Sequence, residues 1–182
     1  MFKKLDILDE KDPHLRKISK EATLPLPKEY KDIIKRIIQE LTYSQIEEYE
    51  KKYSLRPGMG LAFPQLGINE RIIVIVHEID EEKFDNYVVV NPKIISYSDE
   101  IIAAEAGEGC LSVNREVEGH VPRYARVTIE GYDPDGNKIK IRAREELSIA
   151  FQHEIDHLDG ILFYDKIDKK KPFYNEGEIR LI

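Results

Sequence analysis

The chain has 182 residues, of which 41% are hydrophobic and 35% are charged, and its formal net charge is −7. This length suits one globular domain that buries its own core, so we expect residues 1–182 to form a single domain. The acidic balance argues against broad nucleic-acid binding, which needs a basic surface. No run approaches the ~20 apolar residues of a membrane span, and the first residues lack the apolar core of a signal peptide. We therefore expect a cytoplasmic protein with no membrane partner and no specific nucleic-acid site.

The first half of the chain predicts one long helix followed by two strands. After the loop 25–30, apolar residues recur at helical spacing and predict a helix that covers a sheet; they are Ile33, Ile34, Ile37, Ile38 and Leu41. The charged stretch 42–56 is typical of a solvated helical face, and Pro57-Gly58 ends it. The β-branched runs 71–76 and 87–95 predict two strands.

The second half predicts a hairpin and a helix. Residues 126–132 and 138–141 alternate with period two around the turn 133–136, which reads DPDG. Residues 145–158 predict a helix, with Gly160 as its C-terminal cap. The layout indicates an α+β fold of mostly antiparallel sheets around a central helix, with a long N-terminal helix.

The last predicted helix carries the pentapeptide 153–157, which reads HEIDH. Helical spacing puts His153 and His157 on one face, where they can bind one metal ion with Glu154 beside it as a base. A catalytic metal site needs a third protein ligand and one open position for water. The 25 residues after His157 contain no histidine, and the carboxylates of Glu176 and Glu178 lie in a polar tail. The third ligand is therefore expected upstream.

The single cysteine, Cys110, lies in the segment 107–112, GEGCLS, whose glycines let the backbone approach a ligand closely. A metal-bound cysteine is a thiolate. Together with His153 and His157 it gives a tetrahedral site suited to zinc or iron(II). Two alternatives are a buried structural cysteine and a covalent nucleophile with a histidine base. The nucleophile would leave Glu154 and the paired histidines without a role.

A third segment, residues 58–65, reads GMGLAFPQ. Taken in order, GMGLAFPQ, EGCLS and HEIDHLDG resemble the motifs of the peptide deformylase family, whose glycine-rich motif has the form GxGLAAPQ. The resemblance spans essentially the whole chain, including residues 12–16. The stretch 113–123 resembles the longer loop of the type 2 bacterial subclass.

The resemblance implies a hydrolase that removes the formyl group from the N-formyl-methionine of nascent polypeptides and releases formate. It implies that Glu154 transfers protons between water and the leaving amine. The Gln65 side-chain amide and the Leu111 backbone N–H would donate to the formyl oxygen, each contributing ~3 kcal/mol. The implied metal ligands are Cys110, His153 and His157. The implied metal is iron(II) in the cell, with Zn(II), Ni(II) or Co(II) possible in purified protein.

The resemblance also implies contacts with an N-formyl-methionyl nascent peptide close to the ribosome, made by a monomeric enzyme. Met59, Ile149 and Ala150 are candidates for the methionine pocket, with ordinary core packing as their alternative. Gly60 can offer backbone hydrogen bonds to an extended peptide. Phe63 departs from the family motif, which has alanine there. Because a benzyl group needs extra volume, either its neighbours are smaller or the cleft wall is reshaped.

Two other functions compete with deformylation. One is an HExxH peptidase that hydrolyses internal peptide bonds, and it requires a third ligand other than Cys110. The other is a non-catalytic, metal-stabilised scaffold that binds ribosomes or peptides, in which Glu154 would be dispensable. The remaining polar candidates match no ligand spacing and are expected to be structural; they are His14, His77, His120 and Asp156.

Overall fold

The computed structural model describes residues 2–175 and 177–182. Its helices are η1 (Pro13–Arg16), α1 (Lys28–Ser44), α2 (Glu47–Tyr53), η2 (Phe63–Leu66), α3 (Glu145–Leu158) and η3 (Phe163–Lys166), where η denotes a 3-10 helix. Its strands are β1 (Gly60–Ala62), β2 (Ile72–Asp80), β3 (Lys83–Tyr97), β4 (Ile101–Ala103), β5 (Arg123–Tyr124), β6 (Arg126–Tyr132), β7 (Lys138–Arg144) and β8 (Arg180–Leu181). The predicted α+β class is confirmed.

Most strands belong to one antiparallel sheet with the order β1-β2-β3-β6-β7. The predicted hairpin is β6–β7, in which Tyr132 pairs with Lys138. Its turn is stabilised by Asp133, whose carboxylate accepts hydrogen bonds from the backbone and side chain of Asn137. The second sheet has the order β5-β4-β8, and β8 pairs with β4 in parallel. This parallel pair is compatible with the mostly antiparallel sheets that the sequence predicts.

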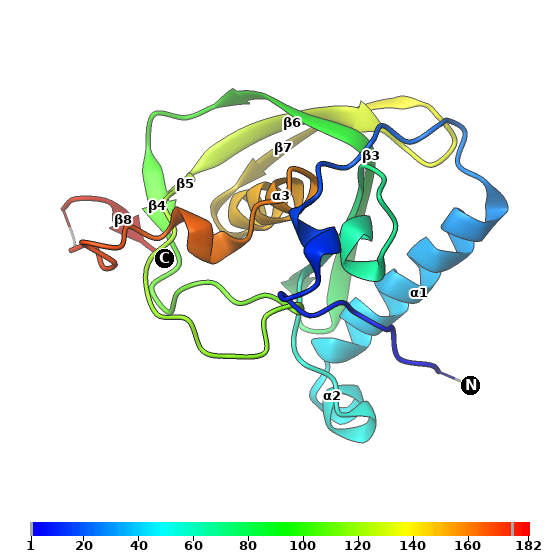
Figure 1. Ribbon diagram of the computed structural model, residues 1–182, viewed down its shortest axis with the longest axis horizontal. Coiled ribbons are helices and arrows are strands. Elements are labelled where there is room, and N and C mark those ends of the chain that lie inside the picture. The colour runs from blue at the N-terminus through cyan, green and yellow to red at the C-terminus, as the bar shows by residue number, and fades with distance from the viewer. Residues whose placement is uncertain (1, 176) are drawn as a thin grey trace.

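The large sheet separates two hydrophobic clusters. Side chains of β2 alternate between them: Ile72, Val74 and Val76 pack with α1, whereas Ile73 and Ile75 pack with α3. The run from residue 72 to residue 76 is therefore apolar throughout because both faces of this strand are buried. Figure 1 shows α3 at the centre of the molecule, with β6 and β7 arching over one side of it. The helix with the HEIDH pentapeptide is thus the central helix, as predicted.

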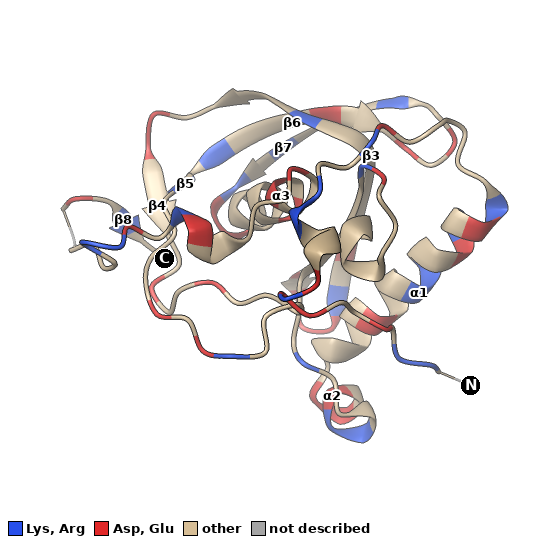
Figure 2. Ribbon diagram, viewed as in Figure 1, with Lys and Arg blue, Asp and Glu red and all other residues tan. Residues whose placement is uncertain are grey.

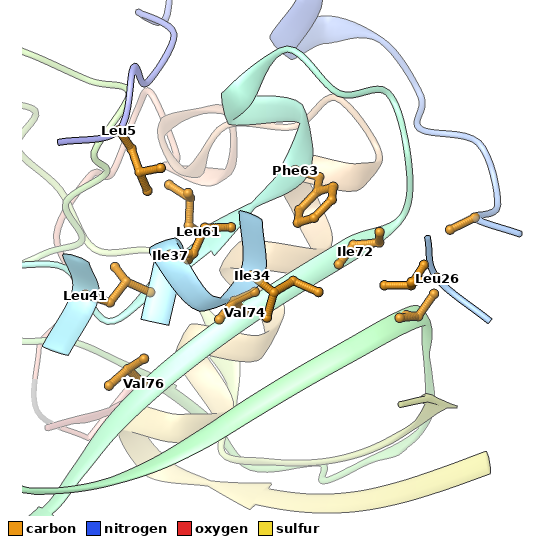
Figure 3. Packing of buried hydrophobic residues seen from close by; sticks show 12 residues of the cluster. Leu5, Leu26, Ile34, Ile37, Leu41, Leu61, Phe63, Ile72, Val74 and Val76 are labelled. Atoms are coloured by element: carbon orange, nitrogen blue, oxygen red, sulfur yellow. The ribbon is translucent and has the colours of Figure 1, made fainter. Parts of the chain in front are cut away.

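Phe63 lies in the cluster on the α1 side of the sheet. It is 0% exposed, and its ring makes an edge-on contact with Tyr30, with 5.5 Å between the ring centroids. Figure 3 shows its side chain among the apolar residues beneath α1, near Ile34 and Ile72. The benzyl group therefore fills core volume under α1, and Phe63 does not line the cleft. Of the two alternatives that the sequence leaves open, reshaping of the cleft wall is not found at this residue.

The charged stretch after α1 forms the separate short helix α2. Acidic residues occupy its first turn and Lys51 and Lys52 its last, an order that complements the helix dipole. Figure 2 shows both signs of charge interspersed along α1 and α2. Within the described residues, no helix is long and apolar enough to cross a membrane.

Candidate active site

A cleft of about 840 Å³ opens beside α3. One wall is the face of α3 that carries Ile149, Ala150, His153 and Glu154, which recur at helical spacing. The other walls are the loop into β1, residues 56–60, and the loop 107–111. The three motifs found in the sequence therefore meet at one cleft.

The candidate metal ligands converge beside this cleft, which Cys110 and His153 line. The ligand atoms of Cys110, His153 and His157 all lie within 4.8 Å of one another. Cys110 Sγ lies 3.3 Å from His157 Nε2. A tetrahedral metal with bonds of ~2.0–2.3 Å holds its ligands ~3.3–3.8 Å apart, so this pair already has the spacing that a bound ion requires. His157 is 1% exposed, which keeps competing water away.

His153 is oriented by a buried carboxylate. Its Nδ1 lies 2.9 Å from Glu108 Oε2, which leaves Nε2 for the metal. Glu108 also accepts from Arg123, at 2.8 Å from Nε and 2.9 Å from Nη2. Although burial acts in the opposite direction, hydrogen bonds from Arg123 and His153 lower the pKa of Glu108 to about 2. Glu108 is therefore an anion that can hold the imidazole in one tautomer.

Arg123 links this carboxylate to Asp156. The guanidinium is 1% exposed, and its Nη1 donates to Asp156 at 2.5 Å. Asp156 also pairs with Lys166 at 3.0 Å. Asp156 thus has a supporting position within the pentapeptide, as expected. The positive charge of Arg123 thus offsets part of the cost of burying the two carboxylates.

Glu154 lies in the cleft with a carboxylate suited to proton transfer. Burial is the main reason that its pKa is raised to about 7. Its Oε2 has no hydrogen-bond partner among the described residues. Gly60 lies directly against it, since a Cβ on Gly60 would be 2.5 Å from Glu154 Oε1. A glycine at this position leaves room for the carboxylate.

Gln65 has an orientation that suits a hydrogen-bond donor at the metal site. Its Oε1 accepts from the Ala62 backbone N–H at 2.8 Å, which directs Nε2 toward Cys110 Sγ, 3.7 Å away. The same Nε2 donates to Ser112 Oγ at 3.1 Å. The backbone N–H of Leu111 has no hydrogen-bond acceptor within residues 2–175 and 177–182. Both predicted donors thus lie at the cleft, and of the two only the Leu111 N–H has no acceptor among the described residues.

The candidate pocket residues also lie together. Met59, Gly60, Ile149 and Ala150 all line the cleft, although Met59 and Ala150 contact the core cluster on the α3 side as well. Their two interpretations, as pocket and as core, are therefore compatible.

The other candidates lie elsewhere. Glu178 is engaged by Lys171 and the Asn175 backbone, and Glu176 lies outside the described residues. His120 accepts from the Tyr174 N–H at 3.0 Å, which is a structural role. Sequence reasoning missed Glu108 and Arg123. Glu108 adjoins the cysteine motif and could have been suspected, whereas Arg123 carries no spacing signal.

Comparisons with known proteins agree on one family. The family model described as polypeptide deformylase matches residues 4–173. The chain is 46% identical over 169 residues to peptide deformylase 2 of Bacillus anthracis, covering 92% of this chain and 91% of that protein. Its structure is similar to that of the plant peptide deformylase PDF1B, with a TM-score of 0.75, 30% identity and coverage of 91% and 82%. It also resembles a Met-Ala-Ser-bound peptide deformylase from Acinetobacter baumannii, with a TM-score of 0.73, 25% identity and coverage of 92% and 100%.

Proposed function

Because this chain belongs to the polypeptide deformylase family, whose members are metal-dependent hydrolases that remove the N-formyl group from nascent polypeptides, we propose that the cleft beside α3 is its active site. The chain is therefore a hydrolase of N-formyl-methionyl peptides, and the peptidase alternative is not favoured. The observation that carries the placement is the convergence of Cys110, His153 and His157 next to the buried carboxylate of Glu154.

The donor set fits a divalent metal. Cys110, His153 and His157 would hold the ion through one thiolate and two imidazoles, and a tetrahedral metal with three protein ligands would keep one position for water. A bound metal would supply a Lewis acid that polarises the formyl oxygen and makes the attacking water more acidic. We propose iron(II) as the metal in the cell, since this mixed sulfur and nitrogen set suits iron(II) as well as zinc. Zn(II), Ni(II) and Co(II) are the alternatives in purified protein.

The protein's own groups carry the proton transfers. Glu154 takes a proton from the water whose oxygen adds to the formyl carbon, and it returns that proton to the amine nitrogen as the carbon–nitrogen bond breaks. The products are formate and a free N-terminal amine. Gln65 Nε2 and the Leu111 N–H donate to the formyl oxygen while it carries negative charge, which lowers the barrier. Removal of either donor should lower the turnover rate more than it weakens the binding of substrate.

The substrate enters as an extended peptide. We propose that the methionine side chain lies against Met59, Ile149 and Ala150, all at the cleft. Gly60 begins β1, which is the edge strand of the large sheet, so its backbone can pair with a peptide. A peptide deformylase from A. baumannii with a similar structure has been solved with Met-Ala-Ser bound, which supports a peptide as the ligand here.

The proposal also covers the enzyme's domain organisation, oligomeric state and location. Residues 1–182 act as one deformylase-like catalytic domain, and the enzyme works as a monomer in the cytoplasm. It meets its substrates close to the ribosome, where formylated N-termini emerge.

The direct test is formate release from a formyl-Met peptide by anaerobically prepared protein of measured metal content. The wild type should release one formate for each free amine, and Glu154→Gln should lose turnover by about 10²- to 10⁴-fold while remaining folded and metal-bound. Unchanged turnover in Glu154→Gln would favour a scaffold. Cleavage of internal peptide bonds without formate would favour a peptidase.

A further inference from the structure

Arg56 makes an unusual set of contacts at the rim of the cleft. Its Nη1 donates to the Val113 carbonyl at 3.0 Å, and its Nη2 donates to the Cys110 carbonyl at 3.0 Å and to the Leu111 carbonyl. A single guanidinium thus binds three carbonyls of the loop that carries the cysteine ligand. Within the part of the chain that the structure describes, no carboxylate pairs with it.

These contacts determine how one peptide group is oriented. The Cys110 carbonyl and the Leu111 N–H belong to the same peptide unit, which is trans and planar, so they point in opposite directions. The Cys110 carbonyl accepts hydrogen bonds from Arg56 and from the Val113 N–H, which lies 3.0 Å away, and these bonds fix its direction. The Leu111 N–H must therefore point away from Arg56, and it has no acceptor among the described residues.

We propose that Arg56 is a positioning residue that holds the Cys110–Leu111 peptide so that its N–H is ready to stabilise the oxyanion. The inference rests on the proposed function, because it assumes that the formyl oxygen accepts from Leu111. The arginine acts through this peptide and does not touch the reacting atoms. Its positive charge also polarises the peptide group in the direction that strengthens the N–H as a donor.

The side-chain chemistry favours arginine for this task. Arginine presents five N–H donors in a rigid plane, so one side chain can engage three carbonyls whose directions are fixed relative to one another. Lysine is a point charge on a flexible stem and cannot fix three carbonyls at once. The conservative variant Arg56→Lys therefore separates the effect of charge from the effect of geometry.

Kinetics per bound metal provide the first test. Loss of a complete oxyanion donor costs about 10²- to 10³-fold in kcat, so a misdirected donor should cost about 10- to 100-fold in Arg56→Gln and Arg56→Lys. KM for a formyl-Met peptide should change by less than about threefold, because the N–H is needed mainly in the transition state. Methylguanidinium should restore part of the kcat of Arg56→Ala. Arg16→Gln, which removes an arginine bound to the Gly160 carbonyl outside the cleft, should keep its kcat.

A second readout needs neither metal nor turnover. In metal-free protein, amide exchange at Val113 should be about tenfold faster in Arg56→Gln than in Arg16→Gln, because the Cys110 carbonyl that Val113 binds is no longer held. Equal Val113 exchange, or unchanged kcat in both Arg56 variants, overturns the proposal. So does a raised KM with kcat retained, which would make Arg56 a substrate ligand. If the wild type releases no formate from any peptide, the proposed function fails first and this inference fails with it.

Discussion

Adding one methyl group at Gly60 should disable the enzyme without unfolding it. A Cβ at this position would lie 2.5 Å from Glu154 Oε1 and 2.8 Å from its Cγ and Cδ. Ordinary contact begins at 3.4 Å, so the carboxylate would have to retreat by about 0.9 Å. Misplacing a catalytic group by ~1 Å can cost ~10²-fold in rate, and we expect a loss of that size in Gly60→Ala.

The fold should accept this substitution. Gly60 does not have a positive φ, so alanine can adopt its strand conformation. Replacing glycine by alanine at a compatible position generally stabilises a protein by ~0.4–1 kcal/mol through the unfolded chain. Displacing the Glu154 side chain will cost free energy that offsets part of this gain. The thermal unfolding midpoint should therefore stay within a few degrees of wild type.

The assay is formate release per bound metal from a formyl-Met peptide, with Gly109→Ala as the matched comparison. A Cβ at Gly109 meets nothing within 4 Å, although this glycine also borders the cleft. We expect Gly109→Ala to lose less than about threefold. Gly60→Ala activity above one third of wild type, or an equal loss in both variants, would refute the claim that the position of Glu154 limits the rate.

Three further outcomes follow from the buried charges and the metal. Arg123→Met should lower the free energy of unfolding by ~3–5 kcal/mol in urea titrations, because it removes the buried cation that two buried carboxylates share, whereas the exposed Arg126→Met should cost less than ~1 kcal/mol. Burial raises the pKa of Glu40, so its contribution to stability is fully present below its unfolded-state pKa and is lost as the pH rises through the raised value. Glu40→Gln should therefore flatten the dependence of stability on pH above about 4.5, and an unchanged pH profile would argue against that shift. Chelation should abolish formate release and added Fe(II) should restore it; activity that survives complete metal removal would contradict the metal site.

Local patterns in the sequence predicted the elements that bear the site. The HEIDH helix was expected at residues 145–158 and is α3 with those bounds. The hairpin 126–132 with 138–141 is also confirmed, because both its strand alternation and its turn are local signals. The pairing of β4 with β8 was not predicted. These short strands are far apart in the chain, and they pair through backbone groups that leave no periodic pattern.

The site was predictable from the sequence where a residue type in a given spacing has one main chemical role. Two histidines four apart and a single cysteine are chemically specific, and the structure brings Cys110 to both imidazoles. Arg123 was not predicted, because a buried arginine can be identified only once the carboxylates that surround it in the fold are known. Of the two consequences that the sequence leaves open for Phe63, a reshaped cleft wall is not found at this residue. A strand directs successive side chains to opposite faces, and the segment after β1 turns this ring toward α1.

We propose that Cys110, His153 and His157 jointly hold the metal that deformylation requires. X-ray absorption at the edge of the bound metal tests it most directly. We expect one sulfur ligand at about 2.3 Å and two or three nitrogen or oxygen ligands at about 2.0–2.2 Å, with the sulfur contribution lost in Cys110→Ser. A fully active, metal-loaded enzyme whose spectrum contains no sulfur ligand would contradict it.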